Sequence, residues 1–228
     1  MVTITPYDKD IEPNVRLKLE IIKTFIELSN LIGKNRIIWR YDPILLNERY
    51  TIKFHLQMFE KMCQLLYKYT NTVIISFLDI YKNIINKFNE LSDEDVYLLA
   101  DNLGRIAKKY HLEIKTCSEK YHLEQYGIKK GSCLEKNYIE DLIGYPLDIK
   151  TNQNRTNCSC LASIDIGAYS CCNHGCLYCY ACNHQLVAKN MANHDENSEM
   201  LLGHLTDHDK VIKRNVFSNK EKQLKFDF

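Results

Sequence analysis

Four short apolar runs, separated by much longer segments of helical period, set the strongest limit on how this chain can fold. The runs begin at residues 2, 36, 72 and 112 and are rich in β-branched side chains. Between them, apolar residues recur every three to four positions, the period of a helix with one buried face. Units of strand, helix and strand at this spacing predict a parallel sheet, because parallel neighbours need a long crossover. The expected strands are 2–5, 36–40, 72–78 and 112–116.

The fold class is therefore α/β, built from parallel β/α repeats. A complete eight-stranded barrel takes about 250 residues, whereas the repeats here occupy residues 1–149. We expect a partial TIM-like barrel or an open sheet. Ser92, which is followed by three acidic residues, is a favourable helix start, and Gly33 is a favourable helix end.

Composition excludes several classes of function. Hydrophobic residues make up 45% of the chain and charged residues 26%, values typical of a folded protein. The formal net charge of +1 does not indicate a nucleic-acid partner. No apolar run approaches the ~20 residues of a membrane helix, and the first ten residues lack an export-signal pattern. We expect a cytoplasmic protein with no membrane partner.

Cysteine is concentrated in the last third of the chain. Seven of the ten cysteines lie between residues 158 and 182. In a reducing cytoplasm, clustered thiols are more often metal ligands than disulfide partners. The polar segment 150–156 separates this cluster from the repeats, and a charged stretch follows residue 205. We expect a β/α repeat domain at 1–149, a cysteine-rich metal-binding segment at 150–205 and a charged tail at 206–228.

The central cysteines have the spacing CxxxCxxC, at Cys172, Cys176 and Cys179. Three thiolates on one short loop can hold three irons of a 4Fe–4S cluster and leave the fourth iron open. Gly175 allows the tight backbone turn that such a loop needs. These three cysteines are the expected ligands of the main cluster.

Zinc is the alternative metal for the same segment, because closely spaced cysteines and histidines also form zinc sites. The ligands would come from Cys176 with Cys179, or from Cys179 with Cys182 and His184, completed by Cys158 and Cys160. Sequence spacing leaves iron and zinc both open.

Four further cysteines are candidates for a second cluster or a structural zinc site. Cys117 ends the fourth expected strand, Cys133 follows a Gly-Ser pair, and Cys158 and Cys160 precede the main loop. The alternative is four unrelated reduced thiols.

Polar residues also follow the expected strands, at the ends where parallel β/α folds bind their ligands. The candidate substrate-binding residues are Arg40, Tyr41, Asp42, Asp79 and Glu119. Arg40 and Asp42 could instead pair with each other or cap the next helix.

The loop CNHGCLYC at 172–179 resembles the cluster loop of radical S-adenosylmethionine enzymes, with Tyr178 as the aromatic residue before the last cysteine. The resemblance implies that an open iron chelates S-adenosylmethionine and that Tyr178 lies against its adenine. It also implies an electron donor such as flavodoxin or ferredoxin. In those enzymes the loop follows the first strand and a Gly-rich segment follows the second, whereas here the loop is C-terminal and no such segment is found.

Longer segments resemble one uncharacterised bacterial family, the domain of unknown function DUF1848. They include IIWRYDPILL at 37–46, VIISFLDIYK at 73–82 and SIDIGAYSCCNHGCLYCYA at 163–181. The family has a C-terminal cysteine cluster like that of radical S-adenosylmethionine proteins and no established reaction. The resemblance places family cysteines at all four second-site positions. It also implies that the chain lacks the family's N-terminal region.

The leading hypothesis is an iron–sulfur enzyme of radical S-adenosylmethionine type, with an unknown substrate. The alternative is a non-catalytic protein in which zinc or a closed cluster joins the C-terminal segment to the β/α repeats.

Overall fold

The computed structural model describes residues 1–82, 84–151, 159–164 and 166–221, and its centre is a five-stranded parallel sheet. The strands lie in sequential order, each hydrogen-bonded to the next. They are β1 (Val2–Thr3), β2 (Trp39–Ile44), β3 (Thr72–Phe77), β4 (Glu113–Cys117) and β5 (Lys129–Gly131). The expected α/β fold with a parallel sheet is confirmed.

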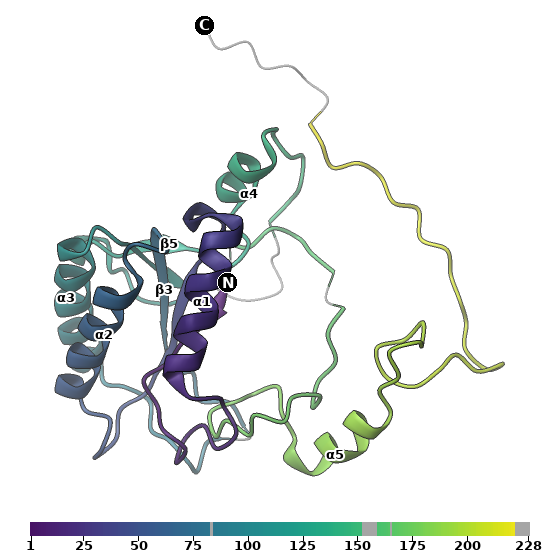
Figure 1. Cartoon of the computed structure of the whole chain (residues 1–228), viewed down its shortest axis with the longest axis horizontal. Coiled ribbons are helices and arrows are strands. Elements are labelled where there is room, and N and C mark those ends of the chain that lie inside the picture. Colours follow the sequence, from purple (N-terminus) through teal and green to yellow (C-terminus); the bar gives the residue numbers. More distant parts are fainter. Residues whose placement is uncertain (83, 152–158, 165, 222–228) are drawn as a thin grey trace, which may run out of the picture.

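Three helices form the crossovers between the first four strands: α1 (Lys18–Ile32), α2 (Ile52–Leu66) and α3 (Asp93–Lys109). Their apolar faces join one core cluster with a single face of the sheet, and α2 packs beside α3 (Figure 1). Sequential strands with helices on one face are built as in a β/α barrel, whereas a doubly wound sheet reverses its strand order. In the described part of the chain β1 pairs only with β2, so the barrel is partial and open.

Helix ends follow the expected signals. The Ser92 side chain accepts a hydrogen bond of 3.1 Å from the backbone N–H of Asp95, and acidic residues occupy the first turn of α3. Gly33 ends α1 with a φ of +89°, a conformation that favours glycine. Both predictions are confirmed.

Two strands differ from the expectation in position or existence. Strand β2 begins at Trp39 because Lys34–Arg36 form a short 3-10 helix instead. Strand β5 was not expected, because its sequence KKG has no apolar run. Charged residues are common on an edge strand, which must resist pairing with other chains.

Strand alternation gives the sheet two different faces. Trp39 and Tyr41 on β2 are fully buried against the helices. Arg40 and Asp42, between and after them, belong to the opposite face because successive strand residues point to opposite sides. Arg40 and Asp42 therefore lie on the polar face of the sheet, within β2.

The remainder of the chain surrounds this unit. It contains a short 3-10 helix (Glu124–Tyr126), α4 (Lys136–Ile143) and α5 (His184–Ala192). Beyond α5 the described tail is extended and returns toward α4, where the backbone N–H of Asp148 donates to the carbonyl of Asn219 at 2.7 Å (Figure 1).

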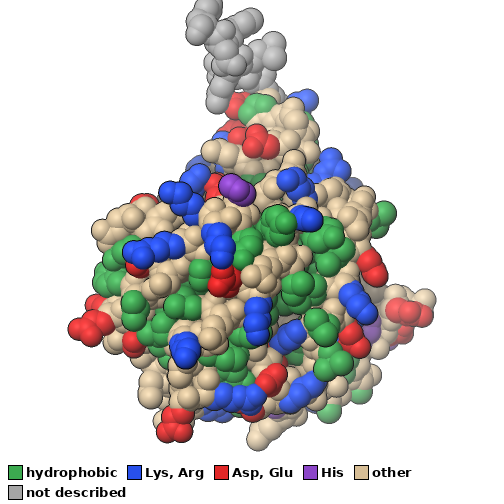
Figure 2. All heavy atoms as spheres, turned by 60° about the vertical axis from the view of Figure 1, so that its left-hand side comes forward, with side chains coloured by type: hydrophobic (Ala, Val, Ile, Leu, Met, Phe, Trp, Pro, Cys, Tyr) green, Lys and Arg blue, Asp and Glu red, His purple; other side chains and the backbone are tan. Residues whose placement is uncertain are grey.

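The surface carries charges of both signs, in agreement with the net charge of +1. Figure 2, which brings the side of α2 and α3 forward, shows basic and acidic side chains interspersed rather than separated. None of the described helices is both long enough and apolar enough to cross a membrane.

Candidate functional site

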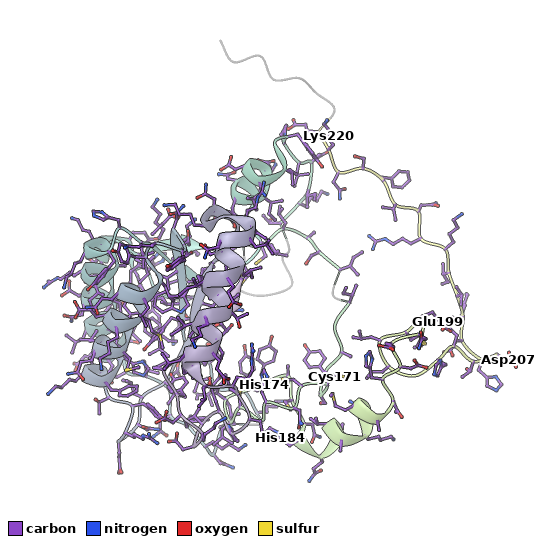
Figure 3. The ribbon with its side chains drawn as sticks, viewed as in Figure 1. Cys171, His174, His184, Glu199, Asp207 and Lys220 are labelled. Carbon is purple, nitrogen blue, oxygen red and sulfur yellow. The ribbon has the colours of Figure 1, made fainter. Side chains whose placement is uncertain are left out.

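The cysteine loop, defined here as residues 172–179, is hydrogen-bonded to the segment that follows β1. The backbone N–H of Asn14 donates to the carbonyl of His174 at 3.0 Å, and that of Leu177 donates to the carbonyl of Ile11 at 3.0 Å. The Asn14 side chain adds a bond of 2.8 Å to the carbonyl of Asn173. Figure 3 shows His174 next to the start of α1. A loop distant in sequence is thus held at the carboxyl edge of the sheet.

Tyr178 anchors the end of this loop. Its hydroxyl donates to the carboxylate of Glu12, which is 3% exposed and also accepts hydrogen bonds from Thr5 and Lys18. Its ring lies 6.0 Å from that of Tyr7, centroid to centroid. Burial, together with the nearby Glu12 charge, raises the pKa of Tyr178 well above its ordinary value.

Apolar contacts complete the docking. Leu177 and Tyr178 pack against a buried cluster made by the loops that follow β1, β2 and β3. Tyr180 stacks on Tyr81, with ring centroids 4.9 Å apart. The carboxyl ends of three neighbouring strands therefore form the platform beneath the cysteine loop.

The three cysteines expected as ligands lie on one short loop that contains two turns, at 173–174 and 177–178. Cys176 is close enough to Cys172 and Cys179 for their charges to interact, and burial and the Glu12 carboxylate raise its pKa to about 11. Gly175 has a φ of +72°, and a Cβ there would lie 3.4 Å from the Asn14 amide nitrogen. The expected glycine turn is present.

Cys182 joins this neighbourhood, although sequence spacing had not selected it as a main ligand. Its thiol is buried, 3.8 Å from the carbonyl oxygen of Cys172 and 3.6 Å from Nδ1 of His184. Burial and the charges of Cys179 and Cys172 raise its pKa. The signal in the sequence was the three-residue step from Cys179. Cys171 instead donates to the carbonyl of Tyr169 at 3.3 Å.

A hollow of about 570 Å³ adjoins the end of the loop. Its lining includes Cys179, Cys182, Tyr180, His184 and Lys87. Cavities of about 300–1,000 Å³ are the usual size for small-molecule and cofactor sites.

Three of the four cysteines predicted for a second site also lie together. The Sγ atoms of Cys117 and Cys133 are 2.9 Å apart. Cys160 hydrogen-bonds to Cys133 and lies within charge-interaction range of Cys117. Cys158 lies outside the described residues. We call Cys117, Cys133 and Cys160 the thiol cluster.

The thiol cluster adjoins the polar face of the sheet. Hydrogen bonding from Cys117 and the positive charge of Arg40 lower the pKa of Cys133 to about 6. The pKa of Cys117 rises, first because it is the partner in that hydrogen bond and then because it is buried.

Neither cysteine group is a finished metal site. Within the described ranges, no three Cys, His, Asp or Glu side chains already have the spacing of ligands around one ion. Metal binding at either group would therefore require the side chains to move.

Of the five candidate substrate-binding residues, Asp79 and Glu119 follow β3 and β4 as expected. Arg40 and Asp42 lie within β2 and not after it, because the strand runs from Trp39 to Ile44 and not over residues 36–40. Arg40 and Asp42 form an ion pair with each other, which is the alternative that the sequence analysis left open. Glu119 is buried and accepts a 2.7 Å hydrogen bond from the N–H of Phe77. Burial, with the nearby Asp79 and Asp42 charges, raises its pKa to about 7.

Tyr41 is separated from this group. It lies on the helix-facing side of β2, fully buried, and its hydroxyl is 2.9 Å from Nδ1 of His55. Glu12 is the polar residue that the strand-end argument overlooked. The acidic segment DKDIE at 8–12, a few residues after β1, was the available signal.

Comparison with known proteins identifies the chain at the level of a family. The model of the domain of unknown function (DUF1848) matches residues 1–181, most of the chain. The protein belongs to the DUF1848 family. No curated protein and no solved structure matches it. The DUF1848 match covers the thiol cluster and the whole cysteine loop, and it ends just before Cys182.

Proposed function

We propose that this DUF1848 protein binds a 4Fe–4S cluster on its cysteine loop and is an enzyme of radical S-adenosylmethionine type. The observation that carries the proposal is the position of the loop. Backbone hydrogen bonds and Tyr178 hold it over the carboxyl ends of the strands, where parallel β/α folds bind substrates.

The side chains present fit the chemistry of such a cluster. Thiolates are the usual ligands of iron–sulfur clusters, and Cys172, Cys176 and Cys179 lie on one short loop. Gly175 has the backbone conformation that the turn requires. A cluster held by three cysteines keeps one iron open. The hollow beside Cys179 has a volume suited to a cofactor.

When bound, an open-iron cluster would chelate S-adenosylmethionine and, with one electron from a flavodoxin or ferredoxin, generate an organic radical from it. The residues of the chain would supply position and binding. Because Glu12 accepts a hydrogen bond from the Tyr178 hydroxyl, the Tyr178 ring would be held in position to lie against the adenine. Asp79 and Glu119, which follow β3 and β4, would bind a polar substrate together with the charged pair Arg40 and Asp42 on the polar face of β2.

One observation favours a second candidate function. Cys182 is buried beside His184 and within charge-interaction range of Cys172 and Cys179. A fourth thiol or an imidazole could close the coordination of a cluster or complete a tetrahedral zinc site. The protein would then be non-catalytic, with the metal joining the C-terminal segment to the sheet.

Metal analysis after anaerobic purification and reconstitution tests the proposal. We expect iron and sulfide in the wild type and their loss in Cys176→Ala, because two thiolates hold a cubane poorly. Cys171→Ala is the matched control and should keep its iron. Iron and a visible spectrum that survive Cys176→Ala would contradict the ligand assignment, and stoichiometric zinc without iron would support the non-catalytic alternative.

A further inference from the structure

Three cysteine thiols from separate parts of the chain lie together beside the polar face of the sheet. Cys117 is the last residue of β4, Cys133 lies two residues beyond β5, and Cys160 belongs to the segment leading to the cysteine loop. We propose that this thiol cluster is a second metal centre, which binds a single thiophilic ion of zinc type.

Backbone contacts hold the three positions in place. Cys117 is in register with Gly131 across the β4–β5 pair. A Cβ at Gly131 would lie 3.1 Å from the carbonyl oxygen of Thr116, so glycine permits this close approach. On the other side, the N–H of Leu161 donates to the carbonyl of Leu134 at 2.9 Å. The cysteines beside these contacts are therefore brought together by the fold itself.

Arg40 supplies the electrostatic environment that a thiolate centre needs. Its charge interacts with Cys133 and Cys117. Its Nε is buried and has no hydrogen-bond partner among the described residues. Three thiolates on a divalent ion carry a net negative charge, and metal-bound ligands commonly accept hydrogen bonds from surrounding groups. A charged N–H donor without a partner suits such a centre.

The spacing of the sulfurs favours one ion over a cubane. Two thiolates on a tetrahedral zinc ion, each at about 2.3 Å from it, lie about 3.8 Å apart. The observed separation of 2.9 Å between Cys117 and Cys133 would have to grow by about 1 Å. Cysteines on a cubane bind different irons and lie further apart still. A single ion thus requires the smaller movement, and soft thiolates select zinc over hard cations.

The proposed ion would tie the end of β4 to the segment after β5 and to the chain that leads to the cysteine loop. Because metal binding at such a site contributes to folding, it would stabilise this connection directly. The proposal concerns residues separate from the cysteine loop and does not depend on the metal bound there.

Site-resolved alkylation of the full chain tests the proposal without altering a ligand. The reduced protein is treated with iodoacetamide, with zinc or with a chelator, and each cysteine is followed by mass spectrometry. Because a metal-bound thiolate is blocked as a nucleophile, zinc should slow the labelling of Cys117, Cys133 and Cys160 together by on the order of tenfold or more. Cys171 is the control and should label at the same rate in both conditions.

Cobalt binding gives a second readout. In a Cys179→Ala protein, which lacks a ligand common to both zinc sets considered for the cysteine loop, added Co²⁺ should still produce a thiolate-to-cobalt charge-transfer band, and Cys133→Ser should remove it. Equal labelling of the three thiols with and without zinc would overturn the proposal. So would a Cys117–Cys133 disulfide in protein purified under reducing conditions, or a cobalt band that persists after Cys133→Ser.

Discussion

Tyr178 of the cysteine loop donates its hydroxyl hydrogen bond to the carboxylate of Glu12, 166 residues earlier in the chain. The Glu12 side chain is 3% exposed and is also bonded by Lys18 and Thr5. A buried carboxylate is costly unless it is paired and hydrogen-bonded. The Tyr178 hydrogen bond therefore helps to stabilise the buried Glu12 carboxylate. Docking of the loop is for this reason coupled to ordering of the segment that contains Glu12.

We expect Tyr178→Phe to lower the free energy of unfolding by about 1.5–3 kcal/mol, the range for hydrogen bonds to charged groups. Urea denaturation measures the loss, and limited proteolysis should show faster cleavage in the cysteine loop. In a double-mutant cycle with Glu12→Gln, the two changes should couple by about 1–2 kcal/mol.

Tyr169→Phe is the matched control for this prediction. Tyr169 precedes the same loop and is 62% exposed, so removal of its hydroxyl should leave stability and proteolysis unchanged. Additive effects in the cycle would show that the Tyr178–Glu12 bond does not hold the loop.

Cys182→Ala distinguishes an open cluster from a closed one. The Cys182 thiol is hydrogen-bonded to the carbonyl of Cys172 and to His184. It is not one of the three cysteines of the CxxxCxxC motif. On the proposed function, we expect S-adenosylmethionine to change the electron paramagnetic resonance signal of the reduced, reconstituted wild type, and we expect the Cys182→Ala variant to show the same change. A wild type that ignores the cofactor, with a variant that responds, would instead identify Cys182 as a fourth ligand and favour the non-catalytic function.

His55 should make stability depend on pH in a defined window. Burial lowers its pKa from 6.5 to about 4, while Nε2 contacts the carbonyl of Leu45 at 2.8 Å. The unfolded chain binds a proton near pH 6.5 and the folded chain does not, so this contribution to stability is complete above pH 6.5 and is lost as pH falls toward 4. The loss by pH 5 is about 2 kcal/mol.

Urea unfolding of the wild type and His55→Gln between pH 7 and pH 5 measures this effect. The difference in unfolding free energy between the two proteins should narrow by about 2 kcal/mol as the pH falls. Parallel curves over this range would mean that His55 titrates at the same pH in both states.

Gly104 is required for the contact between α3 and the chain near Tyr126. A Cβ at this position would lie 2.0 Å from the backbone carbonyl oxygen of Tyr126. Alanine normally stabilises a helix interior by about 1 kcal/mol relative to glycine, but overpacking against backbone costs about 1–3 kcal/mol or more. We expect Gly104→Ala to lower the melting temperature and Lys108→Ala, on the exposed side of the same helix, to leave it nearly unchanged. A more stable Gly104→Ala would contradict the observed packing.

Apolar periodicity was sufficient to predict most of the sheet. Runs 72–78 and 112–116 became β3 and β4 almost at the expected bounds. The buried strand β3 is nearly continuous in apolar residues, as buried parallel strands usually are, whereas β4 alternates buried with partly exposed residues. Strand β5 could not be found this way. Its residues Lys129–Gly131 are held by pairing with β4 and carry no hydrophobic signal of their own.

The local pattern of apolar residues could not distinguish a partial barrel from an open doubly wound sheet. Both architectures use the same β/α repeat, and they differ in the order in which strands pair. That order is set by which side of the sheet each helix covers. Here the shared apolar cluster of α1, α2 and α3 with one sheet face decides it.

Local spacing predicted the members of the cysteine loop but not their surroundings. Gly175 and the three cysteines are neighbours in sequence, so their turn could be expected. The contacts of Tyr178 with Glu12, and of Cys133 with Cys117, depend on the tertiary fold. The strand-end rule grouped Tyr41 with Arg40 and Asp42, because it did not account for the side of the strand on which each side chain lies.

The hydrogen bonds between Asn14 and His174 and between Ile11 and Leu177 join a segment made early in translation to a loop made much later. The ribosome produces the platform first and the cysteine loop last. At about 5–20 residues per second, the interval between the two is on the order of 10–30 s, ample time for the strands and helices to assemble. The loop would therefore emerge onto a folded scaffold, and its thiols would reach their final surroundings only after that scaffold has formed.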